Sequence, residues 1–405
     1  MYMPSNEGFF QDPKKAAAVL KHGILRRYLA KFAGATATTA PGRRVAFIDG
    51  FAGEGEYRHP VTGVTEVGSP RIALTIAQDL RSRGIKLECT FVEKRPDAFA
   101  QLKTLVDSCG DRSALALQGD ISDHYEDAIR RSANIPTLVF LDPFGRSLDH
   151  DQTVAALASR GDTVPTELLL NFSLQAVRRM GARLYEDDGA QGRAATLANL
   201  DSWLGGDWWR AEFLKEELLA LPREERAHPA ALAVWGQYAA RVRDALGYNS
   251  YDVEIRRKPT DKPLFMLALF FPRINALYSY NDHVSLAAQD WRKFLAEMDF
   301  AEAEALDETN PLLGESRLAE ARRRFADDEE ATKRQAIDDV KDSVTLHLSK
   351  LGRLHVSKNL DKVLGTAVGI ARETHIRAAW KELATEGVTN GCPKGSLEKQ
   401  TIWRA

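Results

Sequence analysis

The sequence predicts an α/β fold built on an open, mostly parallel β-sheet. Short apolar runs alternate with segments of helical periodicity along the first half of the chain, and nearly every run ends at an acidic residue or a glycine. The runs cover residues 45–48, 87–92, 114–118, 137–141 and 168–172. Because strands joined by helices return to the same edge of a sheet, these strands should lie parallel.

The expected helices lie between these runs. Apolar residues at helical spacing predict an amphipathic helix over residues 14–32, before the first strand. Ser69 is a plausible N-cap, and Pro70 suits the first helical position of the next helix. Residues 173–248 look helical, with four tryptophans as anchors, and they interrupt the alternation as an insertion or a lid.

Two later segments predict an antiparallel edge. Residues 251–255 alternate polar and apolar side chains, and residues 263–271 form a long apolar run. So short a connection between strands permits only a hairpin. A parallel sheet that closes with such a pair is, by analogy, the arrangement of a Rossmann-like class I methyltransferase fold.

The composition describes a folded protein with more than one domain. The chain has 405 residues, 28% charged residues and a net charge of −2, so any nucleic-acid surface would have to be a local patch. Cys89, Cys109 and Cys392 are too scattered to suggest a disulfide framework or a zinc site. No segment resembles a signal peptide or a membrane helix, so we expect a cytoplasmic protein.

The predicted domains are an α/β domain over residues 1–295, a charged helical connector over residues 296–345, and a basic domain over residues 346–405. The last segment carries ten Lys and Arg against five acids. A helix over residues 374–386, a turn over residues 391–395 and a strand over residues 401–403 indicate a winged-helix-like module. Its expected nucleic-acid contacts are Arg372, Arg377, Lys381, Lys394 and Lys399. The alternative interpretation of residues 346–405 is a small packing or dimerisation domain with a basic rim.

Four acids follow the first four predicted strands, namely Asp49, Glu93, Asp120 and Asp142. Ligands of open α/β sheets bind at the carboxyl ends of the strands, so these acids should share one edge. Glu93 is placed to accept both hydroxyls of a ribose, which favours a nucleoside cofactor.

The other cofactor contacts follow from this placement. Asp120 could accept from an adenine amine while Ile121 packs on the ring. Asp49 would face the amino-acid part of the cofactor together with Gly53 and Gly55, whose missing side chains allow a close backbone approach. The alternative interpretation is that the glycine turn is an ordinary connection after the first strand. The turn lacks the Gly-Lys-Ser or Gly-Lys-Thr ending of a nucleotide triphosphate loop, which disfavours ATP hydrolysis.

Asp142, Pro143 and Phe144 form the predicted reacting centre. Methylation of an exocyclic amine needs an acceptor that holds the amine and a flat group that stacks on the ring, and an acid closely followed by an aromatic residue supplies both. The remaining requirement is alignment of nucleophile and methyl group. In the alternative interpretation, Asp142 caps the next helix and Phe144 packs in the core.

Together, these motifs resemble the three-Cys-motif partner protein family of bacteria. The resemblance rests on residues 49–57, 68–70, 91–93, 119–120 and 140–145, and it implies an S-adenosylmethionine-dependent, class I methyltransferase-like fold. The cysteines in the family name belong to a neighbouring protein, which resembles radical S-adenosylmethionine proteins. The resemblance therefore implies such a protein as a possible partner.

A more distant similarity is to J-type methyltransferases of ribosomal RNA adenine. Lys21 and His22 match a Lys-His pair of that family, which implies a cofactor contact for His22, and a structural role for this histidine has equal weight. Two departures concern the chemistry: Phe51 replaces a histidine, and Asp142-Pro143-Phe144 lacks a second proline.

These observations favour a methyltransferase that uses S-adenosylmethionine on a nucleic-acid or nucleoside amine, in concert with a partner enzyme. The main alternative is a non-catalytic nucleic-acid-binding partner that retains the fold. Metal-dependent nuclease chemistry has less support, because the acids are spread along the sheet edge, and no metal is expected.

Overall fold

The protein, a computed structural model, is described for residues 13–58, 65–110, 113–143, 145, 148–161, 163–187, 189–309 and 316–405. It divides into two compact units. The sheet unit is Leu29–Arg273, and the C-terminal unit combines Met1–Tyr28 with Ile274–Ala405. This division differs from the boundaries that the sequence predicted.

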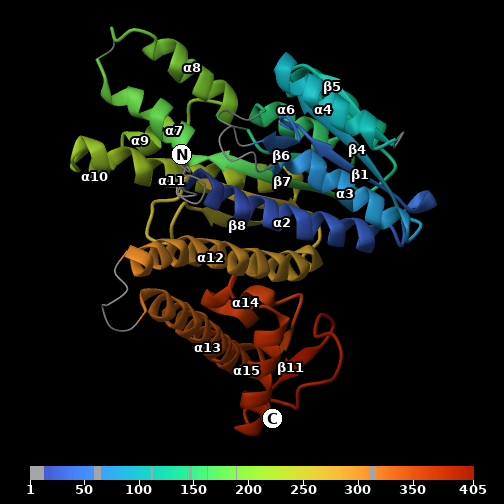
Figure 1. Cartoon of the computed structure of the whole chain (residues 1–405), viewed down its shortest axis with the longest axis vertical. Coiled ribbons are helices and arrows are strands. Elements are labelled where there is room, and N and C mark those ends of the chain that lie inside the picture. The colour runs from blue at the N-terminus through green and yellow to red at the C-terminus, as the bar shows by residue number, and fades with distance from the viewer. Residues whose placement is uncertain are drawn as a thin grey trace. The chain divides into compact units, whose positions relative to one another are not determined.

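The sheet unit is built on a seven-stranded sheet within the described residues (Figure 1). Its order is β5 (Ala114–Gln118), β4 (Lys86–Glu93), β1 (Arg44–Asp49), β6 (Thr137–Leu141), β7 (Thr166–Ser173), β9 (Phe265–Phe271) and β8 (Asn249–Ile255). The first five strands are parallel, and β9 is antiparallel to both β7 and β8. The predicted Rossmann-like class I methyltransferase fold, with its antiparallel edge hairpin, is confirmed.

The strand order reverses between β1 and β6. The chain adds β4 and β5 on one side of β1, then returns to place β6 and β7 on the other side. In an open α/β sheet, such a switch point opens a crevice at the carboxyl ends of the strands. The fold therefore places the residues that follow β1 and β6 where a ligand binds.

Helices connect the parallel strands as the sequence predicted. They are α3 (Ser69–Arg81), α4 (Pro96–Ser108), α5 (Ile121–Arg131) and α6 (His150–Ala158). In the segment before α3, β2 (Glu56–Arg58) pairs antiparallel with β3 (Thr65–Val67).

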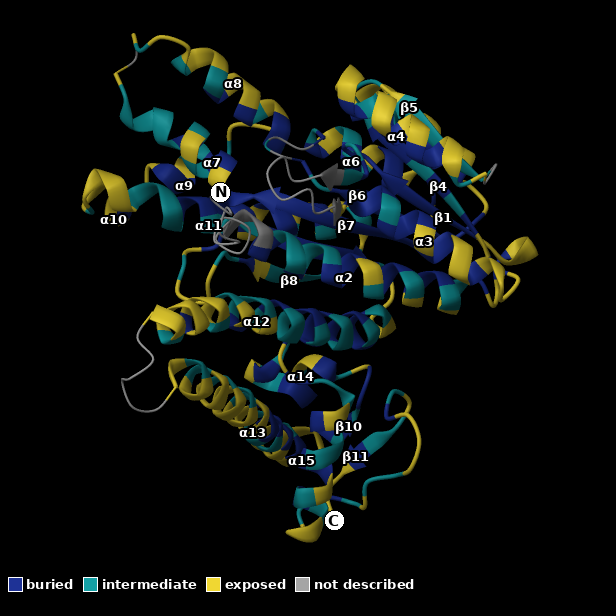
Figure 2. Cartoon of the chain, viewed as in Figure 1, coloured by how far each residue is buried: buried dark blue, intermediate teal, exposed yellow. Residues whose placement is uncertain are grey.

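The helical stretch after β7 is also present. It contains α7 (Leu174–Gly181), η2 (Ala182–Tyr185), α8 (Arg193–Leu204), α9 (Arg210–Phe213), α10 (Glu216–Leu219) and α11 (Arg223–Leu246). Trp203, Trp209 and Trp235 are buried in one core with residues of the sheet, and the Phe172 and Trp203 rings stack with centroids 5.1 Å apart. The stretch is thus an insertion whose apolar side shares the core of the sheet unit (Figure 2).

The C-terminal unit contains two long helices, α12 (Asn275–Thr309) and α13 (Arg317–Leu351). They are followed by β10 (Arg353–His355), α14 (Leu360–Leu364), η3 (Gly365–Ala367), α15 (Glu373–Thr385) and β11 (Thr401–Trp403), which pairs antiparallel with β10. The last helix and strand lie where the sequence predicted them. Helix α2 (Pro13–Thr36) begins in this unit, where Arg27 pairs with Asp290 at 2.5 Å.

The charged helix α13, in the region expected to be a connector, also has a buried side. The second half of α13 buries Ile337, Val340, Val344 and Leu348, which recur at helical spacing. This apolar stripe makes α13 part of the core of the C-terminal unit. Among the described residues, no helix combines the length and apolar character needed to cross a membrane.

A buried arginine stabilises the amino-terminal side of the sheet. Arg160 is only 8% exposed, and its guanidinium donates to the carbonyls of Ser132 and Ile135 at 2.9 and 2.7 Å and to Thr166 Oγ1 at 2.5 Å. These acceptors lie after α5 and at the start of β7. One side chain therefore satisfies buried oxygens from two connections.

We predict that Arg160→Ala lowers the free energy of unfolding by about 3 kcal/mol or more, because several buried acceptors lose their donor. Urea unfolding followed by circular dichroism measures this change. Arg131→Ala, at an exposed position of α5, is the control and should change stability by less than about 0.5 kcal/mol. Equal effects of the two substitutions would contradict a structural role for Arg160.

Candidate functional site

The strand-end acids lie on one face of the sheet. Asp49 is in register with Phe91 of β4 and with Phe140 of β6. Side chains two residues apart on a strand point to the same face, so Glu93 and Asp142 follow Asp49 onto that face. The opposite face carries the buried residues Ile48, Val92, Leu141 and Leu170. The register thus brings three carboxylates together at the switch point.

Asp49 is fully buried at the end of the central strand. Its Oδ1 accepts the Phe51 N–H at 3.1 Å, whereas Oδ2 makes no hydrogen bond of normal geometry among the described residues. Burial raises the pKa of Asp49 to about 7. The negative charges of Asp142 and Glu93 add to the rise, and the Ser69 hydroxyl and the Phe51 N–H oppose it. The carboxyl group of Asp49 therefore gains or loses its proton near neutral pH.

The glycine turn keeps the backbone close to its neighbours. Gly53 and Gly55 have φ angles of +65° and +82°, a region that favours glycine. A Cβ on Gly55 would lie 2.4 Å from Leu105 Cδ2, and a Cβ on Gly50 would lie 2.7 Å from Leu141 Cδ2. The Gly50 N–H donates to Phe140 O at 3.0 Å, which ties the turn to β6. A side chain at Gly50 or Gly55 would therefore have to displace a leucine methyl group, and the φ angles of Gly53 and Gly55 favour glycine.

Glu93 orders the same turn from β4. Its Oε2 accepts the Gly53 N–H at 2.8 Å, and its Oε1 accepts the Arg95 N–H at 2.7 Å. The side chain is partly exposed. A carboxylate oxygen offers two lone pairs, so each oxygen can accept a further hydrogen bond. The predicted ribose contact is therefore compatible with this structural role.

Asp120 caps the helix after β5. It accepts the Ser122 N–H at 3.1 Å and pairs with Lys94 at 2.9 Å. These interactions keep the pKa of Asp120 below its usual range, although partial burial acts in the opposite direction. Ile121, the first residue of α5, is buried in the core of the sheet unit. Both residues lie at the predicted edge, next to Glu93.

Asp142 and Pro143 follow β6, and Phe144 lies outside the described residues. Asn171 of β7 donates from Nδ2 to Asp142 Oδ1 at 2.7 Å. Asn171 is fully buried, and its Oδ1 has no hydrogen-bond partner among the described residues. Asp142 does not cap α6, whose N-cap is Asp149. The structure therefore places a fixed carboxylate and a second, unused acceptor side by side.

Sequence reasoning missed Asn171 and misassigned Ser69. Asn171 is the one polar residue within the apolar run 168–172, and this interruption was the available signal. Gly68, not Ser69, is the N-cap of α3. Ser69 is buried near Asp49, where its hydroxyl favours the ionised carboxylate.

The remaining predicted residues lie in the C-terminal unit. His22 is on α2 and is partly exposed. Arg377 donates to the carbonyls of Pro393 and Gly395 and pairs with Glu373, so it holds the turn after α15. Arg372 is the N-cap residue of α15. Three lysines are exposed, namely Lys381, Lys394 and Lys399.

No group of three or more His, Cys, Asp or Glu in the described ranges could hold a metal ion. The hydrogen bonds resolved for Asp49 and Glu93 within the described residues come from backbone N–H groups. The face thus concentrates negative charge that a cationic ligand would balance.

No protein-family model matches the chain, and no curated protein matches it. Among solved structures, TYW2 of M. jannaschii in complex with AdoMet is similar at 10% identity and a TM-score of 0.27, over 60% of this chain and 74% of that one. The plantazolicin methyltransferase BamL, in complex with a desmethylPZN analog and SAH, is similar at 12% identity and a TM-score of 0.30, over 64% of this chain and 86% of that one. Coclaurine N-methyltransferase, bound to N-methylheliamine and SAH, is similar at 9% identity and a TM-score of 0.24, over 67% of this chain and 88% of that one. TM-scores this low carry no argument about the site, so the fold assignment rests on the strand order.

We predict that Asp49→Asn stabilises the protein at alkaline pH. An acid whose folded-state pKa is raised from 3.8 to about 7 binds its proton more tightly when folded, so the wild type loses stability as pH rises through this window. At about pH 8 the substitution should add up to about 4 kcal/mol to the free energy of unfolding, and the gain should shrink as the pH falls toward 4.

Chemical unfolding over this pH range measures the difference. Asp79→Asn, at an exposed position of α3, is the matched control and should stay within about 0.5 kcal/mol of the wild type at every pH. A constant difference between Asp49→Asn and the wild type would show that Asp49 does not titrate in this window.

Proposed function

We propose that the protein is an S-adenosylmethionine-dependent methyltransferase whose cofactor binds at the carboxyl ends of β1, β4, β5 and β6. The observation that carries this proposal is the buried Asp49, flanked by Glu93 and Asp142 on one face at the switch point. S-Adenosylmethionine carries positive charges on its sulfonium and ammonium groups and one negative charge on its carboxylate, so it is a cation overall. A ligand of this charge offsets the cost of ionising Asp49.

The residues present fit this cofactor. Asp49 Oδ2, which has no hydrogen bond among the described residues, and the positive-φ glycines 53 and 55 suit the amino-acid end. Glu93 retains lone pairs for the ribose hydroxyls, and Asp120 with Ile121 would hold the adenine. When bound, S-adenosylmethionine supplies a methyl group on a positively charged sulfur. The chain itself contributes binding, orientation and the fixed negative face.

We further propose an amine of a nucleic acid or nucleoside as the methyl acceptor. Asp142 is held by Asn171 at 2.7 Å, so its carboxylate has a set orientation. A carboxylate beside the nucleophile can accept an N–H and direct the nitrogen lone pair toward the methyl group. Transfer then depends mainly on alignment, which a fixed acceptor provides.

The C-terminal unit is proposed as the nucleic-acid contact. Two observations support this proposal. The order of α13, β10, α14, α15 and β11 is compatible with a winged-helix-like module, and Lys381, Lys394 and Lys399 are exposed around α15 and the following turn. A partner protein of the radical S-adenosylmethionine type, as implied by the family resemblance, would act in concert with this unit. The alternative function is a non-catalytic partner that keeps the pocket and binds nucleic acid.

The first test concerns the cofactor. If the cofactor binds ionised Asp49, the dissociation constant should weaken by up to about tenfold per pH unit below about pH 7 and level off above it. Isothermal titration at about pH 6, 7 and 8 measures this slope. Asp49→Asn should bind weakly with no slope, and S-adenosylhomocysteine, which lacks the sulfonium charge, should show a smaller slope. Undetectable binding to the wild type at millimolar cofactor would refute the proposal.

The second test concerns transfer. We predict that Asp142→Asn lowers methylation of an RNA or nucleoside amine at least about 100-fold and leaves the cofactor dissociation constant within about threefold of wild type. Incorporation of labelled methyl groups into total RNA, together with titration, separates the two quantities. Asp123→Asn, at an exposed position of α5, is the control. A wild type that binds cofactor but transfers no methyl group would favour the non-catalytic alternative.

A further inference from the structure

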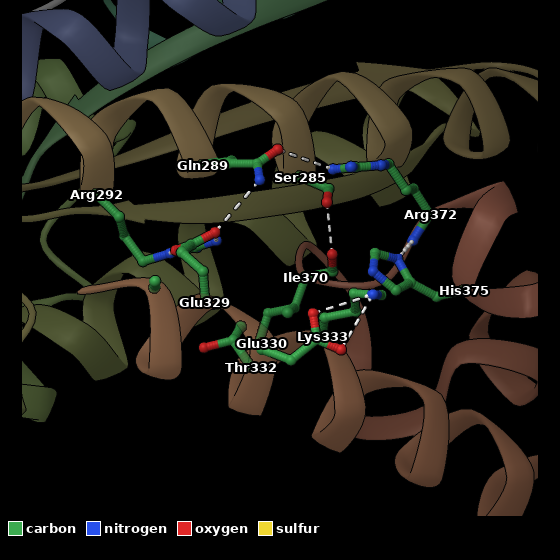
Figure 3. Close-up of a pocket in the computed structure, with 11 residues that line it drawn as sticks. Ser285, Gln289, Arg292, Glu329, Glu330, Thr332, Lys333, Ile370, Arg372 and His375 are labelled. Carbon is green, nitrogen blue, oxygen red and sulfur yellow. Dashed lines mark hydrogen bonds and ion pairs between the residues drawn. The ribbon is translucent and has the colours of Figure 1, made fainter. Parts of the chain in front are cut away.

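A cavity of about 180 Å³ lies within the C-terminal unit (Figure 3). Its walls come from α12, α13 and the segment that leads into α15, and we name it the Arg372 cavity after the residue at this segment's end. Its volume equals that of about six water molecules. None of its lining residues belongs to the proposed cofactor site, so it is a separate feature of the molecule.

The two carboxylates in the wall already have partners. Arg292 of α12 donates to Glu329 of α13 at 2.5 and 3.2 Å, and Gln289 donates to the same carboxylate at 3.3 Å. Glu330 accepts from Lys333 at 3.0 and 3.1 Å. The Arg292–Glu329 pair is bidentate and joins the two long helices, so its charges largely cancel.

Arg372 is the cation in the wall that lacks an ion pair among the described residues. Its one resolved side-chain contact in the cavity is with Gln289 Oε1 at 3.4 Å, at the long limit of a hydrogen bond. The acid that senses its charge, Asp282, accepts the backbone N–H of Glu373 at 3.2 Å. The guanidinium therefore has donors available to a ligand.

His375 supplies a neutral donor beside Arg372. Its ring is 8% exposed, and Nδ1 accepts the Arg372 backbone N–H at 3.1 Å, so the proton of the neutral ring resides on Nε2. Burial and, to a smaller extent, the charges of Arg372 and Lys333 together lower the pKa of His375 to about 4. The imidazole thus stays neutral at physiological pH. No hydrogen-bond partner of Nε2 is resolved within the described part of the chain.

Lys333 completes the set from α13. Figure 3 shows Lys333, Arg372 and His375 on the same side of the cavity. The ion pair between Lys333 and Glu330 is exposed to solvent, since 55% of the Lys333 side chain and 71% of the Glu330 side chain are accessible. Such an exposed pair contributes little stability. Lys333 can therefore turn toward a bound anion at small cost.

We propose that the Arg372 cavity binds a phosphoryl group, as inorganic phosphate or as the terminal phosphate of a small monoester. Arg372 would bind two oxygens through its planar guanidinium, His375 Nε2–H would donate to a third, and Lys333 would balance the second charge. A tetrahedral dianion presents a separate oxygen to each donor and a second charge to Lys333, whereas a carboxylate has two oxygens and one charge. The cavity holds a phosphoryl group with its hydration water but not a whole nucleotide, so the rest of a monoester would extend from the mouth.

The test is isothermal titration of the full-length protein with sodium phosphate, at constant ionic strength and about pH 7.5. We expect saturable binding that Arg372→Gln weakens at least about tenfold and that Lys333→Gln weakens about threefold. Lys333 lies on the exposed side of α13, so its substitution should leave the fold intact, and thermal melting checks this for each variant.

Arg353→Gln is the matched control, since it removes the same charge from an exposed position of the same unit outside the cavity. Glycerol 3-phosphate and glycerol, which lack the adenosyl group of the proposed cofactor, separate the sources of the phosphoryl group: tighter binding of glycerol 3-phosphate than of free phosphate identifies a monoester, and the reverse order identifies inorganic phosphate. Binding of glycerol alone, no binding of either phosphate, or equal losses in Arg353→Gln and Arg372→Gln would each overturn the proposal.

Discussion

The structure of the site depends on one constraint, the burial of a carboxylate at the end of the central strand. Parallel strands place their carboxyl ends at one edge, and the register between β1, β4 and β6 puts Asp49, Glu93 and Asp142 on one face of that edge. Because Asp49 is fully buried and has two acids near it, its ionisation costs several kcal/mol. The apolar core on the opposite face of the sheet offsets this cost.

Much of the fold could be predicted because its signals are local. The apolar runs are short, lie between helical segments and end in acids or glycines, so they could be assigned to parallel strands one by one. The antiparallel edge followed from the short connection between residues 255 and 263. The division into units could not be predicted in this way, because it depends on which distant elements α12 and α13 contact. The charged surface of α13 hid an apolar stripe that recurs only every third or fourth residue.

The position of the site could be predicted from the sequence, whereas the hydrogen bonds between its side chains could not. The four acids could be placed at one edge from the strand pattern alone, whereas the contact from Asn171 to Asp142 depends on the register between β6 and β7. Likewise, Ser69 reads as a helix cap in the sequence, but its burial beside Asp49 arises from where α3 begins. His375 gave no sequence signal, since its role follows from a hydrogen bond that fixes its tautomer.

An acid at a strand end can serve the fold or a ligand, and the sequence could not distinguish these two roles. The contacts of Glu93 and Asp120 now separate them. Both acids have structural partners without any ligand, so their presence at the strand ends is explained in part by the turn and by the helix cap. Asp49 differs, since its buried Oδ2 serves no structural purpose and its charge destabilises the fold. A buried acid that costs stability when ionised and leaves one oxygen without a hydrogen bond is explained best by a ligand, and a cation is the ligand that favours its ionised form. The argument for a sulfonium cofactor therefore rests on Asp49 more than on the number of acids at the edge.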